Sequence, residues 1–151
     1  MNCRDDYTLS TEPEAQQPER IHAYLARSYW ASGIPLETVR RSLAGSLCFG
    51  VFHAGLQVAL ARVVSDRATF AYLCDVYVLE EHRGRGLAAW MLEAIAAHPE
   101  LQGLRRFILA TRDAHGLYAR HGFEPLSRPQ AFMEILAKAS YAAPAQPDPK
   151  G

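Results

Sequence analysis

Hydrophobic residues follow two different periods along residues 69–98, and the rest of the chain is arranged around this stretch. Residues 69–79 are dense in Val, Tyr, Phe and Leu, which predicts a buried β-strand. Apolar side chains then recur at spacings of three and four residues, which predicts a helix beginning near Gly84. That apolar face consists of Leu87, Trp90, Met91, Ala94 and Ile95. Pro99 disfavours the helical region for the residue before it, so the helix should end at His98.

The chain before this stretch predicts a strand, two helices and a pair of further strands. Pro18 and Pro35 can each occupy the first turn of a helix, and Gly33 should end the first of the two. The polar, proline-bearing residues 11–19 predict a loop. The three strands are predicted at residues 7–11, 47–53 and 56–64.

After the central helix, residues 106–111 predict another strand. Because a helix connects it to the strand at 69–79, the two strands should run parallel. Asp113 is a predicted N-cap for a helix over residues 114–121, and Gly122 is its predicted left-handed terminator.

Two apolar segments near the end of the chain, residues 123–126 and 131–136, predict a hairpin that finishes the sheet. Residues 142–151 are rich in Pro and Ala and predict a flexible tail. The domain is therefore placed at residues 1–141.

The composition limits the class of protein. The 151 residues suit one domain. Lys+Arg and Asp+Glu both number 16, so the net charge is zero, whereas nucleic-acid-binding domains are typically basic. No apolar run reaches membrane length, and the N-terminus has no basic-then-apolar signal. Three cysteines without a CxxC pattern and six histidines without ligand spacing predict reduced thiols and no metal. We expect a cytoplasmic protein without nucleic-acid or membrane partners.

A glycine-rich turn joins the predicted strand to the predicted helix. It reads Arg83-Gly84-Arg85-Gly86-Leu87-Ala88. The first amides of a helix lack intrahelical partners and carry the positive end of its dipole, and glycines let a ligand approach the backbone. Arginine adds planar donors suited to phosphate oxygens. The turn therefore predicts a pyrophosphate site.

Other interpretations of this turn differ in how well they fit. No Gly-Lys-Ser/Thr follows it, which excludes a Walker phosphate loop. A dinucleotide fingerprint fits poorly, because it needs G-x-G-x-x-G and a later acidic residue on the ribose. A polar strand-to-helix corner with two solvated arginines is compatible with the six residues alone.

Two motifs place the chain close to a known family. Val76-Tyr77-Val78 followed by Arg83-x-x-Gly86-x-Ala88 resembles the acetyl-CoA signature of the GCN5-related N-acetyltransferase (GNAT) family. Farther on, Tyr118 precedes Gly122-Phe123 by four residues, which is similar to the last helix of that family. The strand order fits over residues 7–136.

This resemblance implies an α/β, single-domain GNAT fold. The expected sheet is mixed, mostly antiparallel and twisted, with about six or seven strands flanked by about four helices. Its two parallel central strands should splay apart, so that freed backbone groups of the first strand pair with the pantetheine arm of acetyl-CoA, the implied cosubstrate. The amide of Val76 is then the predicted donor to the thioester oxygen, and the side chains of this strand should be ordinary core. The implied cofactor-binding residues are Val76, Tyr77, Val78, Arg83, Gly84, Arg85, Gly86, Leu87 and Ala88.

Tyr118 is the predicted general acid. A phenol with a pKa of about 10 is protonated at neutral pH, and the thiolate of a thiol with a pKa of about 8.5 can take its proton. The structural alternative is a helix tyrosine packed beside Ala114 and Leu117.

An arriving primary amine is mostly protonated at neutral pH, so the reaction needs a general base. The sequence indicates this base less clearly than the acid. At the positions that match the family, the chain has Tyr72 and Cys74, which is a departure. Asp75 lies one residue away, and a β-bulge could turn it inward, so Asp75 is the second predicted catalytic residue. A buried structural aspartate, or a base made of water and backbone carbonyls, are the alternatives. Cys74 has no histidine placed in the sequence to activate it, which argues against an acyl-cysteine step.

Residues 28–35 are apolar and aromatic at the junction of two predicted helices. In the family this segment covers the acceptor pocket, which implies that Tyr29 and Trp30 bind the substrate. A helix-to-helix corner packed on the core is the alternative.

The predicted function is an acetyl-CoA-dependent N-acetyltransferase that acts on a primary amine of a small molecule or peptide, by direct attack in a ternary complex. A CoA- or acyl-CoA-binding sensor or regulatory module without turnover is the other class. Homodimers are common among similar proteins, and the sequence neither requires nor excludes one. The acceptor and the acyl chain length are not specified by the sequence.

Overall fold

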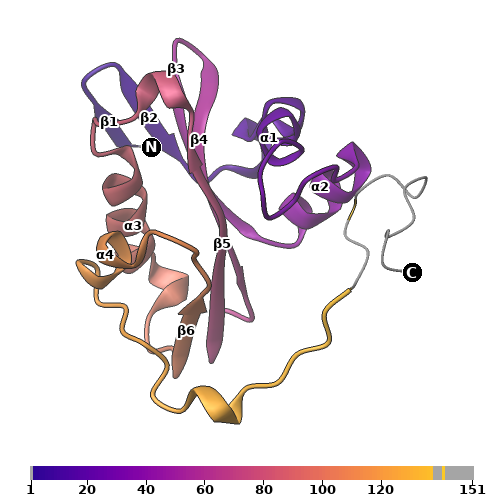
Figure 1. Cartoon of the computed structure of the whole chain (residues 1–151). Helices are drawn as coiled ribbons and strands as arrows, with labels where there is room; N and C mark the ends of the chain where they lie inside the picture. Colours follow the sequence, from indigo (N-terminus) through magenta and orange to yellow (C-terminus); the bar gives the residue numbers. More distant parts are fainter. Residues whose placement is uncertain (1, 138–140, 142–151) are drawn as a thin grey trace.

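A six-stranded sheet forms the centre of the computed structural model, which describes residues 2–137 and 141 (Figure 1). Its strands are β1 (Asn2–Arg4), β2 (Tyr7–Ser10), β3 (Leu47–His53), β4 (Leu56–Ser65), β5 (Phe70–Val78) and β6 (Arg106–Leu109). They lie side by side in the order of the sequence. Every neighbouring pair is antiparallel except β5 and β6, which run parallel.

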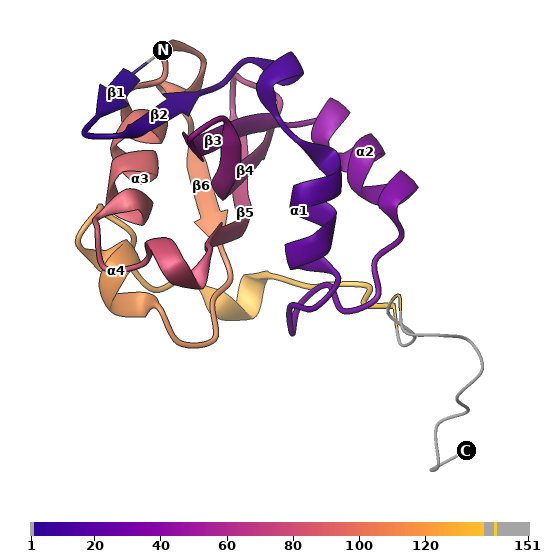
Figure 2. The same cartoon turned by 90° about the horizontal axis from the view of Figure 1, so that it is seen from above.

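Helices cover both faces of the sheet (Figure 2). One face carries α1 (Pro18–Leu25) and α2 (Leu36–Ala44), and the other carries α3 (Leu87–Ala97) and α4 (His115–Ala119). Short 3₁₀ helices lie at η1 (Pro13–Ala15), η2 (Glu80–His82), η3 (Pro99–Leu101) and η4 (Pro129–Ala131). No helix in the described ranges is long and apolar enough to cross a membrane.

Apolar residues form a core on each face of the sheet. Residues 58–61 of β4 are buried without interruption, as expected for a strand covered on both faces. The larger cluster joins the sheet to α3 and includes Leu73 and Met91. The smaller cluster joins the sheet to α1 and α2 and includes Ile21 and Val39. Apolar packing on both faces therefore fixes the position of β5 in the sheet.

Most of the sheet follows the sequence pattern. The predicted strands at 47–53, 56–64 and 69–79 correspond to β3, β4 and β5 within one residue at each end, and the parallel pairing of β5 with β6 is confirmed. The central helix is α3, which begins later than expected because Gly84 and Gly86 both have a left-handed φ of 76°. The short, polar strand β1 was not predicted.

The first predicted helix is shorter than its pattern suggests, since α1 ends at Leu25 and not at Gly33. The hydroxyl of Ser28 donates to the carbonyl of Leu25 at 2.7 Å and accepts the amide N–H of Ala31 at 3.1 Å. A serine that bonds to nearby backbone offers an alternative to the helix, and here it stabilises a turn. The residues after Ser28 therefore lie on a loop and not on a helix.

The start of α4 also differs from the prediction. Asp113 is not the N-cap, because α4 begins at His115 after Ala114, which has no side-chain cap bond. The hydroxyl of Thr111 accepts the amide N–H of Ala114 at 3.1 Å instead. The left-handed terminator is confirmed, with a φ of 94° at Gly122.

The final hairpin, predicted at residues 123–126 and 131–136, is wrong: the structure has no strand in these two segments. After α4 the chain is irregular, forms η4, where Pro129 occupies the first helical turn, and continues without helix or strand through residue 137. A hydrophobic pattern predicts strand character but does not specify a pairing partner. Within the described residues, β6 is the edge of the sheet. The tail predicted at residues 142–151 lies outside the described residues.

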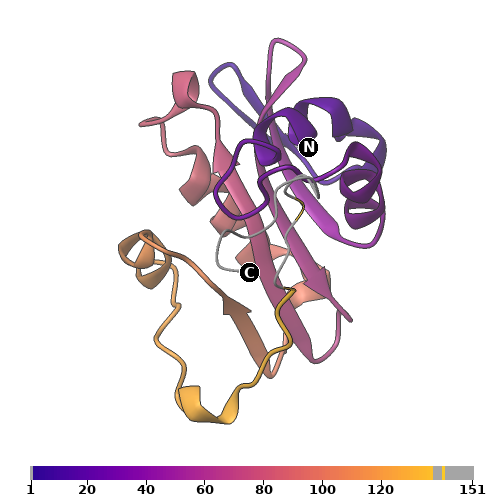
Figure 3. The ribbon, with the colours of Figure 1, turned by 45° about the vertical axis from the view of Figure 1, so that its right-hand side comes forward.

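The two parallel strands separate after only four paired positions. Pairing runs from Phe70 opposite Arg106 to Leu73 opposite Leu109, while β5 continues to Val78. Figure 3 shows β6 diverging from β5 toward α4. The carboxyl half of β5 is thereby left without β6 beside it, as the expected splayed arrangement requires.

Candidate active site

A cavity of about 370 Å³ opens where β5 and β6 separate. It is lined by residues 72–76 of β5, by residues 109–114 at and after the end of β6, and by Tyr29, Trp30 and Tyr118. These segments come from three separate parts of the sequence. The structure therefore brings together both predicted catalytic residues, both predicted acceptor-binding residues and Val76.

A β-bulge interrupts β5 at the wall of this cavity. Leu60 pairs with Tyr77 and Arg62 pairs with Cys74, so that Asp75 and the residue after it share one position of β4. Asp75 has a φ of 53°, a left-handed conformation that is uncommon outside glycine. The bulge considered for this strand is therefore present, and it re-aims the side chain of Asp75.

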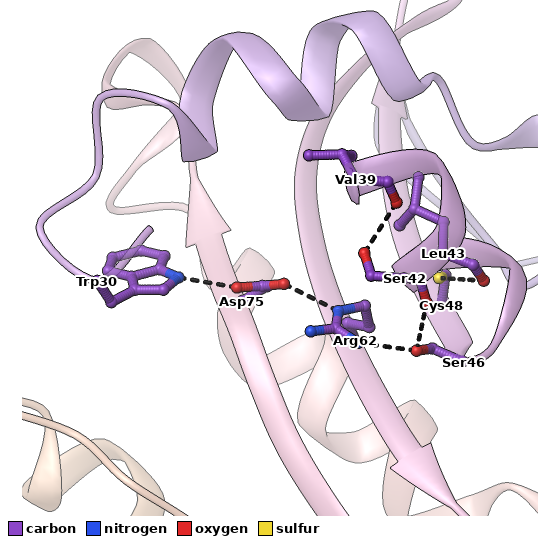
Figure 4. A network of polar contacts seen from close by, with 8 residues as sticks. All are labelled: Trp30, Val39, Ser42, Leu43, Ser46, Cys48, Arg62 and Asp75. Atoms are coloured by element: carbon purple, nitrogen blue, oxygen red, sulfur yellow. Dashed lines mark hydrogen bonds and ion pairs between the residues drawn. The ribbon is translucent and has the colours of Figure 1, made fainter. Parts of the chain in front are cut away.

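The carboxylate of Asp75 is the centre of a polar network (Figure 4). Its Oδ1 accepts the indole N–H of Trp30 at 2.8 Å, and its Oδ2 accepts Nε of Arg62 at 2.8 Å. Nη1 of Arg62 also donates to the hydroxyl of Ser46 at 2.9 Å. The ion pair is well shielded, with side-chain exposures of 17% for Arg62 and 11% for Asp75. An unpaired charge in this shielded position would lower the stability of the fold. The ion pair therefore fixes both side chains in place.

Tyr118 lies on the opposite wall, on α4, and is 8% exposed. Burial raises the pKa of its phenol above the ordinary value, with Tyr29 adding to the increase. The amide N–H of Phe123 donates to the carbonyl of Tyr118 at 3.1 Å, across the left-handed Gly122. The Gly-Phe turn thus closes the helix directly beneath the tyrosine.

Tyr29 and Trp30 form an aromatic wall at the mouth of the cavity. Their rings pack edge to face with centroids 5.1 Å apart, and the guanidinium of Arg112 lies 3.7 Å from the centroid of Tyr29. They are 55% and 39% exposed, which is unusual for large aromatic residues of a core. These two side chains are available to a ligand, whereas a simple helix-to-helix corner would bury them.

The turn after β5 presents the backbone at the start of α3. The first helical hydrogen bond runs from the N–H of Trp90 to the carbonyl of Gly86, so the amides of residues 87–89 precede it. A Cβ added at Gly84 or Gly86 would meet no atom within 4 Å. The left-handed φ at both positions, and not crowding, is what favours glycine. The space above the turn is open to a ligand.

The two arginines of this turn have different environments. Nε of Arg83 donates to the carbonyl of Val78 at 2.9 Å, and its Nη2 donates to the hydroxyl of Tyr24 at 3.1 Å. Arg83 therefore ties the end of β5 to α1. Arg85 instead lines a second cavity of about 880 Å³, together with Leu87 at the start of α3.

This second cavity contains residues that the sequence motifs did not indicate. The hydroxyl of Tyr7 lies 2.8 Å from Nδ1 of His82, and the rings of His53 and His82 are 5.1 Å apart. All three side chains, together with Arg85, line the cavity. Their positions in the sequence are far apart, and only the pairing of β2 with β3 and the course of η2 bring them together. Arg62 was also missed, although a charge inside a buried strand is a signal for a buried partner.

The remaining residues of β5 contribute backbone or core. The ring of Tyr77 is 4% exposed and stacks on Tyr24 with centroids 4.1 Å apart. Burial raises the pKa of the Cys74 thiol to about 11, although the charge of Arg62 opposes the increase. A neutral, half-buried thiol is a poor nucleophile. No group of three His, Cys, Asp or Glu residues suited to a metal ion occurs in the described part of the chain.

Comparisons with known proteins agree with this architecture. The model of the acetyltransferase (GNAT) domain family matches residues 44–125. A relative from Gibberella zeae, named as a candidate acetyltransferase, is 34% identical over an alignment of 141 residues that covers 78% of each chain. A crystal structure of a GNAT-family protein from Xanthomonas campestris pv. campestris is 53% identical, with a TM-score of 0.88 over 91% of this chain and 97% of that one.

A more distant structure shares the fold alone. It is a candidate acetyltransferase from Clostridium acetobutylicum, crystallised with acetyl-CoA, with 15% identity and a TM-score of 0.62 over 86% of this chain and 94% of that one. The parallel strands that separate, and the glycine turn at the N-terminus of α3, are the arrangement of a GNAT-type acetyltransferase. This class agrees with the family match. The chain belongs to the GNAT acetyltransferase family.

Proposed function

We propose that the protein transfers an acetyl group from acetyl-CoA to a primary amine of a small molecule or peptide, by direct attack in a ternary complex. The observation that carries this proposal is the cavity between the separated ends of β5 and β6, where Val76, Tyr118 and the aromatic wall meet. A transfer between two bound molecules needs one place where both reacting groups are held together. This cavity offers a donor side along β5 and an acceptor side at Tyr29 and Trp30.

The chemistry of the turn after β5 fits acetyl-CoA. The backbone at Gly84 and Gly86 is open, and the amides at the start of α3 can bind a diphosphate. Arg85 supplies a cation beside them, while Arg83 holds the end of β5 in position. The fold relative from Clostridium acetobutylicum that was crystallised with acetyl-CoA supports this assignment. When bound, acetyl-CoA supplies an activated thioester.

The residues of the cavity then have separate tasks. The amide of Val76 is proposed to donate to the thioester oxygen as negative charge develops there. The hydroxyl of Tyr118 is proposed to give its proton to the sulfur as the carbon–sulfur bond breaks. Because burial raises the pKa of Tyr118, the phenol is protonated throughout the neutral range, as an acid must be.

The acceptor amine has to lose a proton when its nitrogen attacks. Asp75 is the proposed acceptor of this proton. Each of its oxygens already accepts one hydrogen bond, from Trp30 and Arg62, and each keeps a second lone pair. A relay of water and backbone carbonyls is the competing arrangement.

The aromatic wall favours amines that carry an apolar part.

A CoA- or acyl-CoA-binding regulatory module without turnover is the second candidate. The observation that favours it is the Asp75 network, because a carboxylate that is held by a guanidinium and an indole N–H is less available as a base. Such a network would serve equally well to stiffen a binding site.

Release of free thiol from acetyl-CoA, measured with a panel of aliphatic, aromatic and peptide amines, tests the proposal. Amine-dependent release that is lost in Tyr118→Phe supports the enzyme. Calorimetric binding of CoA without release for any amine supports the regulatory module. A protein that neither binds CoA in calorimetry nor releases thiol would overturn both.

A further inference from the structure

Arg112 is the only arginine or lysine among the described residues that line the cavity between β5 and β6. It follows the end of β6 and is exposed. Its guanidinium lies 3.7 Å from the centroid of the Tyr29 ring, well inside the range of about 6 Å over which an aromatic face attracts a cation. The two residues come from loops that are far apart in the sequence. This contact therefore places a positive charge on the acceptor side of the cavity.

The charge of Arg112 is not paired within the protein. In the part of the chain that the structure describes, no carboxylate forms an ion pair with Arg112, and its neighbour Asp113 is no exception. Arg62, which lies near the same cavity, is instead bound to Asp75. A negatively charged group that enters the cavity would therefore find one guanidinium whose charge is still available.

The contact with Tyr29 also orients this guanidinium. An arginine that lies over an aromatic ring keeps its N–H groups at the edge of the guanidinium plane, where they match two oxygens of a carboxylate or phosphate. Holding the side chain in one orientation reduces the freedom that it loses when a ligand binds. The phenol of Tyr29 is also close enough to Tyr118 to raise its pKa. An anion bound at Arg112 would therefore lie near the proposed general acid.

We propose that the acceptor is an amine that also carries an oxyanion, either a carboxylate or a phosphate, and that Arg112 binds this oxyanion. The aromatic wall then contacts the apolar part of the same molecule. This inference rests on the proposed acetyl transfer, because it names the class of acceptor for the same cavity. The cavity volume of about 370 Å³ suits a small molecule. An anion bound at a fixed point orients the amine toward the thioester, so Arg112 determines specificity.

The structural alternative is a contact that only joins the two loops. In that case, loss of Arg112 lowers kcat/KM by the same factor for every amine, whereas anion binding predicts a selective decrease. Arg112→Gln removes the charge and keeps a polar side chain, and Arg112→Lys keeps the charge without the planar fork. Arg120→Gln is the matched control, because Arg120 is also exposed but does not line this cavity.

Thiol release from acetyl-CoA, measured with pairs of amines that differ only in the anionic group, tests the inference. Phenylalanine and phenethylamine form the carboxylate pair, and O-phosphotyramine and tyramine form the phosphate pair. In the wild-type chain, kcat/KM should be about tenfold to 100-fold higher for the anionic member of at least one pair. This ratio should fall to about one in Arg112→Gln and to an intermediate value in Arg112→Lys. Arg120→Gln should keep the wild-type ratio. The pair with the larger ratio identifies the oxyanion.

Binding without turnover separates this inference from the proposed function. Calorimetry titrates the same amines into the protein saturated with CoA, which carries no acetyl group to transfer. A Kd that rises in Arg112→Gln for the anionic amines alone supports the inference, even where no thiol is released. Transfer with no preference for the anionic amines overturns it and leaves the acetyl transfer intact.

Three further results would overturn the inference. The first is an equal loss for both members of each pair in Arg112→Gln, which indicates a contact between loops. The second is a higher Kd for CoA in the same variant, because the charge would then serve the cosubstrate. The third is a wild-type chain that neither binds nor acetylates any of these amines.

Discussion

The indole nitrogen of Trp30 donates a hydrogen bond of 2.8 Å to the carboxylate of Asp75. This bond links the loop after α1 to the bulge of β5, and the same carboxylate is held from the other side by Arg62. The indole is 39% exposed, and this hydrogen bond holds its orientation. The position of the aromatic wall thus depends on a shielded ion pair in the sheet.

Replacing Trp30 by Phe separates the two roles of this side chain. Trp30→Phe keeps an aromatic ring but removes the N–H donor, and Trp30→Ala removes both. We expect the KM for the acceptor to rise by about threefold to tenfold in Trp30→Phe, which corresponds to about 1 kcal/mol of lost positioning, and further in Trp30→Ala. The KM for acetyl-CoA should stay unchanged. Initial rates with each substrate varied in turn measure both constants. Equal increases in both would contradict the assignment.

Asp75→Asn tests whether the carboxylate takes part in proton transfer. Asn keeps the shape but leaves the charge of Arg62 without its partner, so we expect a loss of stability of about 1–3 kcal/mol. The variant should also lower kcat/KM for the amine, since an amide group cannot accept its proton. Asp113→Asn, which alters another acid of the same cavity, is the control and should keep the wild-type kcat/KM. An unchanged kcat/KM in Asp75→Asn would remove Asp75 from the proton transfer.

Tyr118→Phe should lower kcat by about 100-fold or more and leave the Kd for acetyl-CoA unchanged, because the lost group acts only as the thiolate departs. A raised pKa keeps the phenol protonated to higher pH than an ordinary tyrosine. The alkaline loss of kcat that this group causes should therefore lie at a higher pH than an ordinary tyrosine would give. Tyr72→Phe removes another phenol from the same cavity and serves as the control. An unchanged kcat in Tyr118→Phe would remove it from the mechanism.

How much of the fold follows from the sequence depends on whether an element is specified locally. The strand, glycine turn and helix around Gly84 are specified by their own period and by prolines and glycines at their ends. The terminal hairpin was wrong because the apolar residues of 131–136 fit a strand but do not specify the strand that it would pair with. The start of α4 was misplaced because the hydroxyl of Thr111, and not Asp113, satisfies the first amide.

The candidate site shows the same limit. Tyr118 and Asp75 are both predicted from motif and position, and the structure brings them to one cavity. The link between Trp30 and Asp75 spans distant parts of the chain and requires a bulge, which the sequence allows and the strand pairing locates. The cluster of His53 and His82 has no local pattern at all. Sequence reasoning therefore predicts sites whose residues are close together in the sequence. It misses contacts that depend on how the strands pair.

Gly86→Ala tests the glycine turn as the phosphate site. A φ of 76° costs an alanine about 1 kcal/mol, and the added methyl group would project into the space above the turn. We expect the Kd for CoA, measured by calorimetry, to rise by about tenfold or more. Gly103→Ala is a matched control, because its φ is 70° and its Cβ would also meet no atom within 4 Å. It should lose similar stability with no change in Kd. Equal Kd values in the two variants would contradict the assignment.

The thiol of Cys74 lies in the cavity, and its predicted inertness can be measured. Burial raises the pKa values of both Cys74 and Cys48 to about 11, so at pH 8 about one thiol in a thousand is ionised. Iodoacetamide should therefore modify the exposed Cys3 in the native protein and all three cysteines after denaturation.

Since the proposed reaction passes directly from thioester to amine, Cys74→Ala should retain kcat within about twofold. Intact-mass analysis after incubation with acetyl-CoA should detect no acetyl group on the wild-type chain. A stable acetyl adduct on Cys74, together with a large loss of kcat in Cys74→Ala, would replace direct attack with an acyl-cysteine route.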